Sequence, residues 1–132
     1  MQLGVVEKPI VNDSVDRVTL REDRLVLAGD PHGVWMVREH GSGVRYYTDL
    51  YFKTVGFMPS RMIEVANNAA IGAALAAGFG CSLVSAAAVP AGVPTRELGD
   101  EFVRRFYALV PRSGLTPGQR ELAGRVIAAL RG

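Results

Sequence analysis

The stretch VWMVREHGSGVR, residues 34–45, carries the strongest signal for the fold of this chain. Its first four residues are apolar and include a tryptophan, which predicts a short strand buried on both faces. Two glycines then flank Ser42, and apolar residues recur after it at helical spacing. The predicted helix runs to about Val55 and ends at Gly56, a candidate left-handed cap. A buried strand that leads directly into an amphipathic helix is typical of an α/β fold.

The flanking sequence extends this pattern. The other predicted strands are residues 3–6, 15–20, 25–28, 61–66, 81–84 and 101–110. A charged turn at residues 21–24 separates the second and third of these, and residues 9–14 form a polar loop. Asn67 or Asn68 caps a helix over residues 69–77, and Thr116 caps the last helix. This alternation predicts a Rossmann-like, mostly parallel sheet flanked by helices.

Composition excludes several classes of protein. The chain has 132 residues, 48% hydrophobic and 21% charged, which fits one globular domain with a single core. Its formal net charge of +2 is too small to indicate nucleic-acid binding. The single cysteine, Cys81, cannot form an internal disulfide. Residues 66–89 are long enough to span a membrane, but polar residues and glycines interrupt them, and no targeting segment is recognised. We therefore expect a cytoplasmic protein without a membrane contact.

The strand-to-helix corner at residues 38–45 is the best candidate binding site. Free backbone N–H groups at the start of a helix attract carboxylate, phosphate or sulfate. The Ser42 hydroxyl can add a hydrogen bond, and Arg38 and Arg45 can add charge. In a simpler interpretation the two glycines only turn the chain and Ser42 caps the helix. A short glycine-rich turn is a weak motif, so these residues alone favour the simpler interpretation.

Asn67 and Asn68 begin the next helix and form a second candidate site. The carboxyl ends of parallel strands lie at one edge of a sheet, where ligands bind at topological switch points. The two corners can therefore line one site. Taken alone, one asparagine is more simply explained as a helix cap.

Catalytic and metal chemistry have little support in the sequence. The Gly-Ser-Gly at residues 41–43 lacks the spacing of a nucleophile elbow, and neither His32 nor His40 belongs to a recognisable triad. Cys81 lies in an apolar strand and is predicted to be an inert core thiol. No Cys/His cluster has zinc spacing, and the Gly-Phe-Gly at residues 78–80 follows a helix instead of opening one. We expect no catalytic residue, no metal and no cofactor.

Several segments together resemble LysR-type transcriptional regulators, in the branch that includes regulators of carbon fixation and sulfur assimilation. Residues 38–45 look like the Arg-Glu-x-Gly-Ser-Gly-Thr-Arg corner of their effector-binding domain, with Val44 in the place of the usual threonine. The other matching segments, in order along nearly the whole chain, are residues 3–7, 63–71, 74–85, 104–110 and 115–117.

This resemblance implies a type II periplasmic-binding-protein-like fold, in which a small molecule is held between two lobes. It implies that residues 1–132 are a single, truncated regulatory domain: the second lobe with the crossing strands and last helix of the first. A DNA-binding helix-turn-helix is not expected in this chain. The predicted ligand-binding residues are Arg38, Ser42, Gly43, Val44, Arg45, Asn67 and Asn68.

The leading hypothesis is an effector-sensing regulatory domain that is not an enzyme, binds a small anionic metabolite and makes no direct DNA contact. One alternative is a small α/β enzyme that acts on an anionic substrate at the same corner, although a general acid or base is lacking. Another is a pure dimerisation module. An isolated second lobe would expose Leu3, Val5, Leu122 or Val126, so we expect a homodimer.

Overall fold

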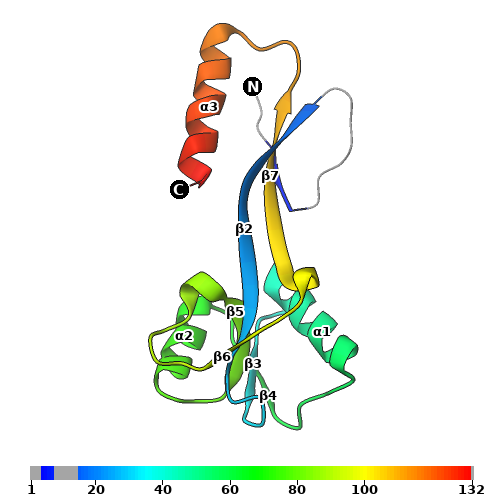
Figure 1. Cartoon of the computed structure of the whole chain (residues 1–132), viewed down its shortest axis with the longest axis vertical. Helices are drawn as coiled ribbons and strands as arrows, with labels where there is room; N and C mark the ends of the chain where they lie inside the picture. Colours follow the sequence, from blue (N-terminus) through cyan, green and yellow to red (C-terminus); the bar gives the residue numbers. More distant parts are fainter. Residues whose placement is uncertain (1–3, 8–14, 132) are drawn as a thin grey trace. The chain divides into compact units, whose positions relative to one another are not determined.

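The computed structural model describes residues 4–7 and 15–131, without the side chain of Val6. The chain divides into two compact units. Unit 1 consists of Met1–Asp23 and Arg104–Gly132, and unit 2 consists of Arg24–Val103. Each unit has its own hydrophobic core. Figure 1 shows the helices and strands that form them.

Unit 2 is built on a mixed sheet. Strand β3 (Trp35–Val37) pairs in parallel with β4 (Met62–Glu64) on one side and with β5 (Cys81–Ser85) on the other. Strand β5 pairs antiparallel with the end of β2 (Val15–Gly29), which also pairs antiparallel with β6 (Thr95–Glu97). The α/β fold class is confirmed. The sheet is mixed and not mostly parallel as expected, because β2 forms antiparallel pairs with β5 and β6, and the parallel order holds only for β4, β3 and β5 among the described strands.

Helices cover both faces of this sheet. Trp35 and Val37 lie in one core cluster with Phe52 of α1 (Gly43–Val55), whereas Met36 lies in another with Ile71 of α2 (Asn68–Ala76). This division follows from strand geometry, because successive side chains point to opposite faces. Figure 1 shows α1 and α2 on opposite sides of the strands. The prediction that β3 is buried on both faces is confirmed.

Unit 1 contains β1 (Gly4–Val6), β7 (Val103–Pro111), the first part of β2 and helix α3 (Pro117–Arg131). Strand β1 pairs antiparallel with β7, which neighbours β2. The core of the unit gathers Leu20, Ala108 and Ile127. Thr116 caps helix α3, as the sequence predicts, and its contacts with Gln119 form a capping box. The Thr116 hydroxyl accepts from the Gln119 N–H at 3.1 Å, and the Gln119 side chain accepts from the Thr116 N–H at 3.0 Å.

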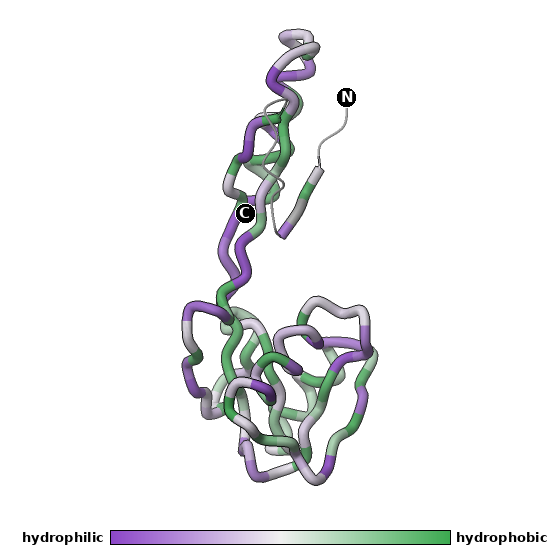
Figure 2. The backbone as a smooth tube through the Cα atoms, turned by 90° about the vertical axis from the view of Figure 1, so that its right-hand side faces the viewer, coloured by the Kyte–Doolittle hydropathy of each residue, from purple (hydrophilic) through white to green (hydrophobic). Residues whose placement is uncertain are grey.

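The charged turn expected at residues 21–24 is wrong, because β2 is one continuous strand from Val15 to Gly29. Side chains of β7 hold this polar segment extended. Arg105 donates to Glu22 at 3.1 Å, and the Arg21 guanidinium lies 5.2 Å from the centre of the Phe106 ring. Figure 2 shows the hydrophilic stretch of the strand, which becomes hydrophobic where it enters unit 2.

Strands β7 and β6 depart from the sequence prediction in the second half of the chain. Strand β7 starts at Val103 because Asp100–Phe102 form a 3-10 turn (η2), which places Phe102 in the core of unit 2. A second 3-10 turn, η1, covers Ala86–Ala88. Strand β6 was not predicted, since its sequence Thr-Arg-Glu has no apolar alternation. The loop predicted at residues 9–14 lies outside the described residues.

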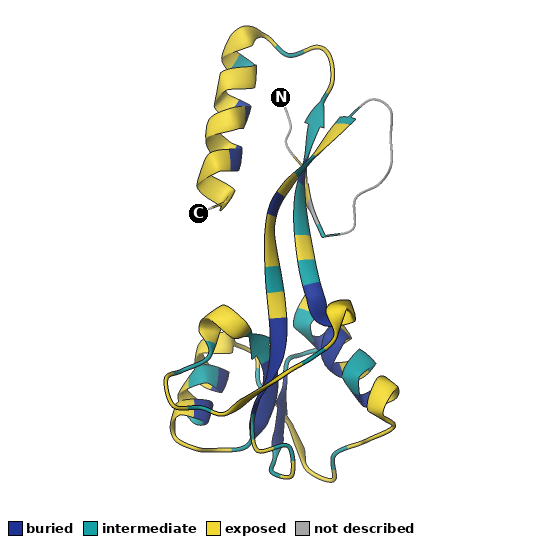
Figure 3. Ribbon diagram, in the orientation of Figure 1, coloured by how far each residue is buried: buried dark blue, intermediate teal, exposed yellow. Residues whose placement is uncertain are grey.

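Helix α3 buries a narrower stripe than its apolar pattern predicts. Ala123 and Ile127 are buried, whereas Leu122 and Val126 are exposed by 53% and 37%. Figure 3 shows that most of the helix is exposed. Val5 is also exposed, so three of the four positions expected to be exposed are so, and Leu3 lies outside the described residues.

Candidate functional site

Arg38 follows directly after β3, and its side chain connects the two predicted corners. Nε and Nη2 donate to the two carboxylate oxygens of Glu39 at 3.2 and 2.7 Å. Nη1 donates to the side-chain oxygen of Asn68 at 2.5 Å. Arg38 is therefore shared between its chain neighbour and the first residue of α2. The structure brings the two corners together, in agreement with the expectation that they can line one site.

The Arg38–Glu39 pair sets the electrostatics of this corner. The hydrogen bond from Arg38 is the main cause that lowers the pKa of the Glu39 carboxyl, and the Glu39 backbone N–H lowers it further. The same side-chain hydrogen bond raises the pKa of Arg38. Both groups are therefore charged at neutral pH, and Glu39 supplies an internal counter-charge to Arg38.

Helix α1 begins beside this pair. Ser42 has extended backbone angles (φ −70°, ψ 136°) and is the N-cap residue, but its side chain makes no capping hydrogen bond. The first helical hydrogen bond runs from the Tyr46 N–H to the Ser42 carbonyl at 3.3 Å. The N–H groups of Gly43, Val44 and Arg45 consequently have no acceptor within the helix. The simpler interpretation is therefore confirmed in the position of Ser42 as the N-cap residue, but the Ser42 hydroxyl itself is not used as a cap.

Arg45 lies in the first turn of α1 and is 7% exposed. Its Nη1 donates to the Arg38 carbonyl at 2.8 Å, and its Nε donates to the Asp49 carboxylate at 3.0 Å. Arg45 and Asp49 therefore form an ion pair between residues four apart on the helix. Both contacts are internal, so the guanidinium of Arg45 fixes the backbone that carries Arg38.

The two asparagines at the start of α2 have different roles. The side chain of Asn67 accepts a hydrogen bond from the Ala70 N–H at 2.7 Å, which makes it the helix cap. Asn68 accepts from Arg38 instead. Helix α2 starts soon after β4, which pairs with β3, so the first turns of α1 and α2 follow neighbouring parallel strands.

Val44, in the first turn of α1, is half-buried, and its carbonyl accepts from the Thr48 hydroxyl at 2.9 Å.

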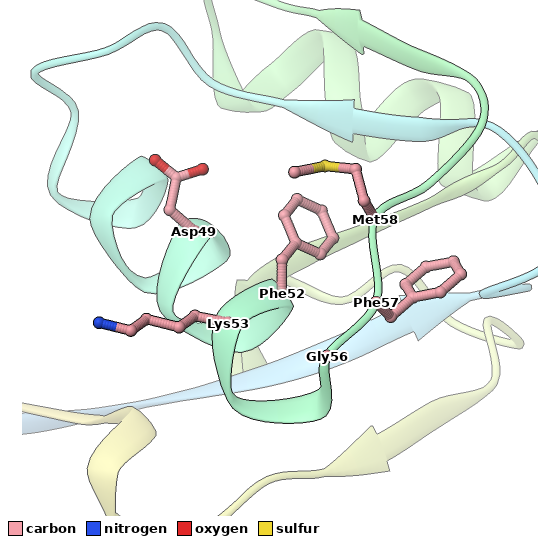
Figure 4. Close-up of a pocket in the computed structure, with 6 residues that line it drawn as sticks. All are labelled: Asp49, Phe52, Lys53, Gly56, Phe57 and Met58. Atoms are coloured by element: carbon pink, nitrogen blue, oxygen red, sulfur yellow. The ribbon is translucent and has the colours of Figure 1, made fainter.

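A hollow of about 370 Å³ lies at the other end of α1, and no residue predicted for the site lines it. Figure 4 shows Phe52 beside Met58, with Phe57 after the turn at Gly56. Gly56 has the predicted left-handed conformation, φ 65° and ψ 33°. Asp49 and Lys53 supply opposite charges to the rim. The sequence signal for this hollow was the apolar pair Phe57-Met58 directly after the helix cap, where both side chains are exposed.

Other chemistries find no support in the described part of the chain. No group of three or more His, Cys, Asp or Glu side chains that could hold a metal ion occurs there. None of the helices in residues 4–7 and 15–131 combines the length and apolar character that a membrane crossing requires. The apolar stretch at residues 66–89 instead forms α2, β5 and the η1 turn.

Comparison with known proteins identifies the fold and the family. Residues 1–131 match the LysR substrate binding domain, whereas no curated protein matches significantly. The regulatory domain of CcmR from Synechocystis PCC6803, in complex with 2-PG, has a TM-score of 0.66 and 22% identity, covering 97% of this chain and 73% of that chain. The BenM effector binding domain with its effector benzoate has a TM-score of 0.59 and 19% identity, covering 96% and 69%.

The fold also occurs outside transcription regulators. An ABC-type phosphate transport receptor from Vibrio cholerae has a TM-score of 0.63 and 12% identity, covering 98% of this chain and 78% of that chain. These structures share the type II periplasmic-binding-protein-like fold. The match along residues 1–131 is the more specific finding, and by it the chain belongs to the LysR substrate-binding domain family.

Proposed function

We propose that this chain is an effector-sensing regulatory domain, not an enzyme, and that it binds a small anionic metabolite where α1 and α2 begin. The observation that carries the proposal is the hydrogen bond from Arg38 to Asn68, which joins the starts of two helices after neighbouring parallel strands. Helix N-termini and an arginine at one point favour a negatively charged ligand. Solved relatives of this fold hold 2-PG, shikimate and benzoate.

The main hydrogen-bond donors to the proposed anion are backbone N–H groups, and side chains contribute less. The N–H groups of Gly43, Val44 and Arg45 lack helical acceptors, and the Ser42 hydroxyl is not used as a cap. Arg38 adds charge, although Glu39 competes for it. A valine at position 44 supplies no hydroxyl, so its contribution is limited to the backbone.

Exposure limits the strength of the interaction. Each exposed charge contact is worth about 1 kcal/mol or less. We therefore expect millimolar binding, about −4 kcal/mol. An affinity of this order is measurable by NMR even when calorimetry gives little heat.

The test is a titration of the ¹⁵N-labelled chain with acetate, phosphate and sulfate, followed through backbone amide shifts. We expect the shifts to concentrate at residues 41–45 and 67–69. The Ser42→Leu variant should lose binding while it retains the circular dichroism and melting temperature of the wild type. Ser60→Leu changes an exposed serine elsewhere in unit 2 and should bind normally. Shifts that cluster away from both corners would show that the site is wrongly assigned.

We further infer that the chain forms a homodimer through unit 1. Val5 is 52% exposed on β1, and on α3 Leu122, Val126 and Leu130 are 53%, 37% and 42% exposed. The last three recur every four residues and therefore lie along one side of the helix. A second copy of the chain would remove this apolar surface from water.

A further inference from the structure

A second hollow, of about 300 Å³, lies in unit 2 on the side of the sheet covered by α1. It is separate from the Arg38 corner. Trp35, the first residue of β3, lines it, whereas Arg38 follows the last residue of that strand. The residues that line it are Pro31, His32, Trp35, Tyr51, Val55, Phe57 and Arg96.

Aromatic side chains make one wall of this hollow, and they are held in place. Trp35 is fully buried, and its indole Nε1 donates to the Pro31 carbonyl at 3.0 Å. The Tyr51 ring stacks on it with centroids 5.6 Å apart and planes at 29°. The centroid of the Phe57 ring lies 6.4 Å from that of Trp35, and Phe57 is 41% exposed. A flat apolar group can therefore contact a preformed aromatic surface.

The charged side of the hollow comes from β6. Arg96 on β6 lies opposite Leu27 on β2 in the sheet. Its guanidinium has no hydrogen bond or ion pair with any described residue. The His32 ring is likewise without a partner within the described ranges, because its contact with the Asp30 carboxylate is made by the backbone N–H. None of the side chains that line the hollow is acidic. An unneutralised guanidinium therefore borders an aromatic wall.

We propose that this hollow is a second ligand site, which binds a small aromatic carboxylate. The carboxylate lies on the Arg96 guanidinium, whose planar donors match two oxygens. The ring lies against Tyr51 and Phe57. An inorganic anion would satisfy only the arginine, and a neutral aromatic molecule only the wall, so the site discriminates in favour of molecules that carry both features. This site stands independently of the function proposed for the Arg38 corner.

The chain carries its own reporter for this site. Trp35 is the only tryptophan among the 132 residues, so the indole N–H gives a single resolved NMR signal. The experiment titrates the ¹⁵N-labelled chain with benzoate, with benzamide as the neutral match and acetate as the charge without a ring. We expect a saturable shift of the Trp35 indole signal with benzoate, and at least about fivefold weaker binding of the other two.

Three variants distinguish binding at Arg96 from nonspecific attraction to basic side chains and from binding at the Arg38 corner. Arg96→Met should weaken benzoate binding by about fivefold, because it removes the charge and keeps the aliphatic stem. Arg61→Met, which changes another exposed arginine of unit 2, should leave the indole response unchanged. Ser42→Leu should also leave it unchanged, so failure at the Arg38 corner and failure here are distinguishable. The proposal is overturned if benzamide binds as well as benzoate, if Arg96→Met binds normally, or if benzoate moves only amides 41–45 and 67–69.

Discussion

The Arg38 guanidinium donates to the side-chain oxygen of Asn68, thirty residues later in the chain, at 2.5 Å. The same arginine accepts a hydrogen bond from Arg45 at its carbonyl, at 2.8 Å. Its backbone is thus held from α1 and its side chain from α2. Such a double anchor reduces the conformational freedom that a ligand would otherwise have to remove.

The Glu39→Gln variant should bind sulfate about two- to fivefold more tightly than the wild type, because it removes the anion that competes for Arg38. Amide-detected NMR titration at low salt measures the change. Glu64→Gln, at an exposed position on β4, is the matched control. Equal affinities in the three proteins would show that Arg38 does not contact the anion.

The same competition predicts a pH dependence. Arg38 lowers the pKa of Glu39, so its charge persists below the ordinary range of a glutamate and is lost only as the pH falls through that lowered value. The stabilisation from this ion pair is lost over the same interval. Sulfate remains ionised there, so its affinity should rise as the pH falls in the wild type and stay flat in Glu39→Gln. A wild-type affinity that stays flat well below the ordinary pKa range of a glutamate, where Glu39 loses its charge, would contradict this.

Asn67→Ala should lower the free energy of unfolding by about 1 kcal/mol, because the first turn of α2 loses its cap. Asn68→Ala should cost less stability, since it removes an exposed partner of Arg38 and leaves the cap intact. Urea denaturation followed by circular dichroism compares the two. Equal losses in both variants would show that the cap is not the dominant contribution at this helix start.

Gly29→Ala should destabilise the chain by at least about 2 kcal/mol. Gly29 has φ +91°, and a Cβ there would lie 2.2 Å from the Gly80 carbonyl oxygen. Gly72→Ala is the control, because that glycine lies within α2 with open space around its Cβ. It should be neutral or stabilise the helix by up to about 1 kcal/mol. Thermal melting measures both, and a Gly29→Ala variant as stable as the wild type would be incompatible with this backbone.

Cys81 should not react with iodoacetamide in the folded chain at about pH 8. Burial raises the pKa of its thiol to about 12, with a smaller contribution from the charge of Asp30. At this pH the thiolate share is then about one part in ten thousand. Ser113→Cys supplies an exposed thiol as the internal control, and urea should release the reaction of Cys81. Equal alkylation of the two thiols in the folded protein would contradict the burial of Cys81.

The double variant Leu122→Glu/Val126→Glu should be monomeric at concentrations where the wild type dimerises, because two charges would enter the apolar side of α3. Ala128→Glu lies on another side of the helix and should not alter the assembly. Sedimentation equilibrium gives the masses. A wild type that is monomeric at high protein concentration would exclude the proposed homodimer.

Elements whose signals are local could be predicted from the amino-acid sequence. The helical spacing after Ser42, the cap at Asn67, the left-handed Gly56 and the cap at Thr116 all depend on residues within a few positions of one another. The resemblance to LysR-type regulators could also be recognised from the sequence, because the motifs and their order along the chain are properties of the sequence itself. Both corners of the candidate site were therefore predictable as separate segments.

The contacts between these segments could be learned only from the tertiary structure. The charged residues 21–24 were predicted to form a turn because their stabilising partners, such as Arg105, lie on β7, about eighty residues later in the chain. The bond from Arg38 to Asn68 and the position of Arg96 beside Trp35 likewise depend on strand order. Local sequence determines backbone preference and burial pattern, whereas pairing between distant segments is determined by which strands become neighbours in the sheet.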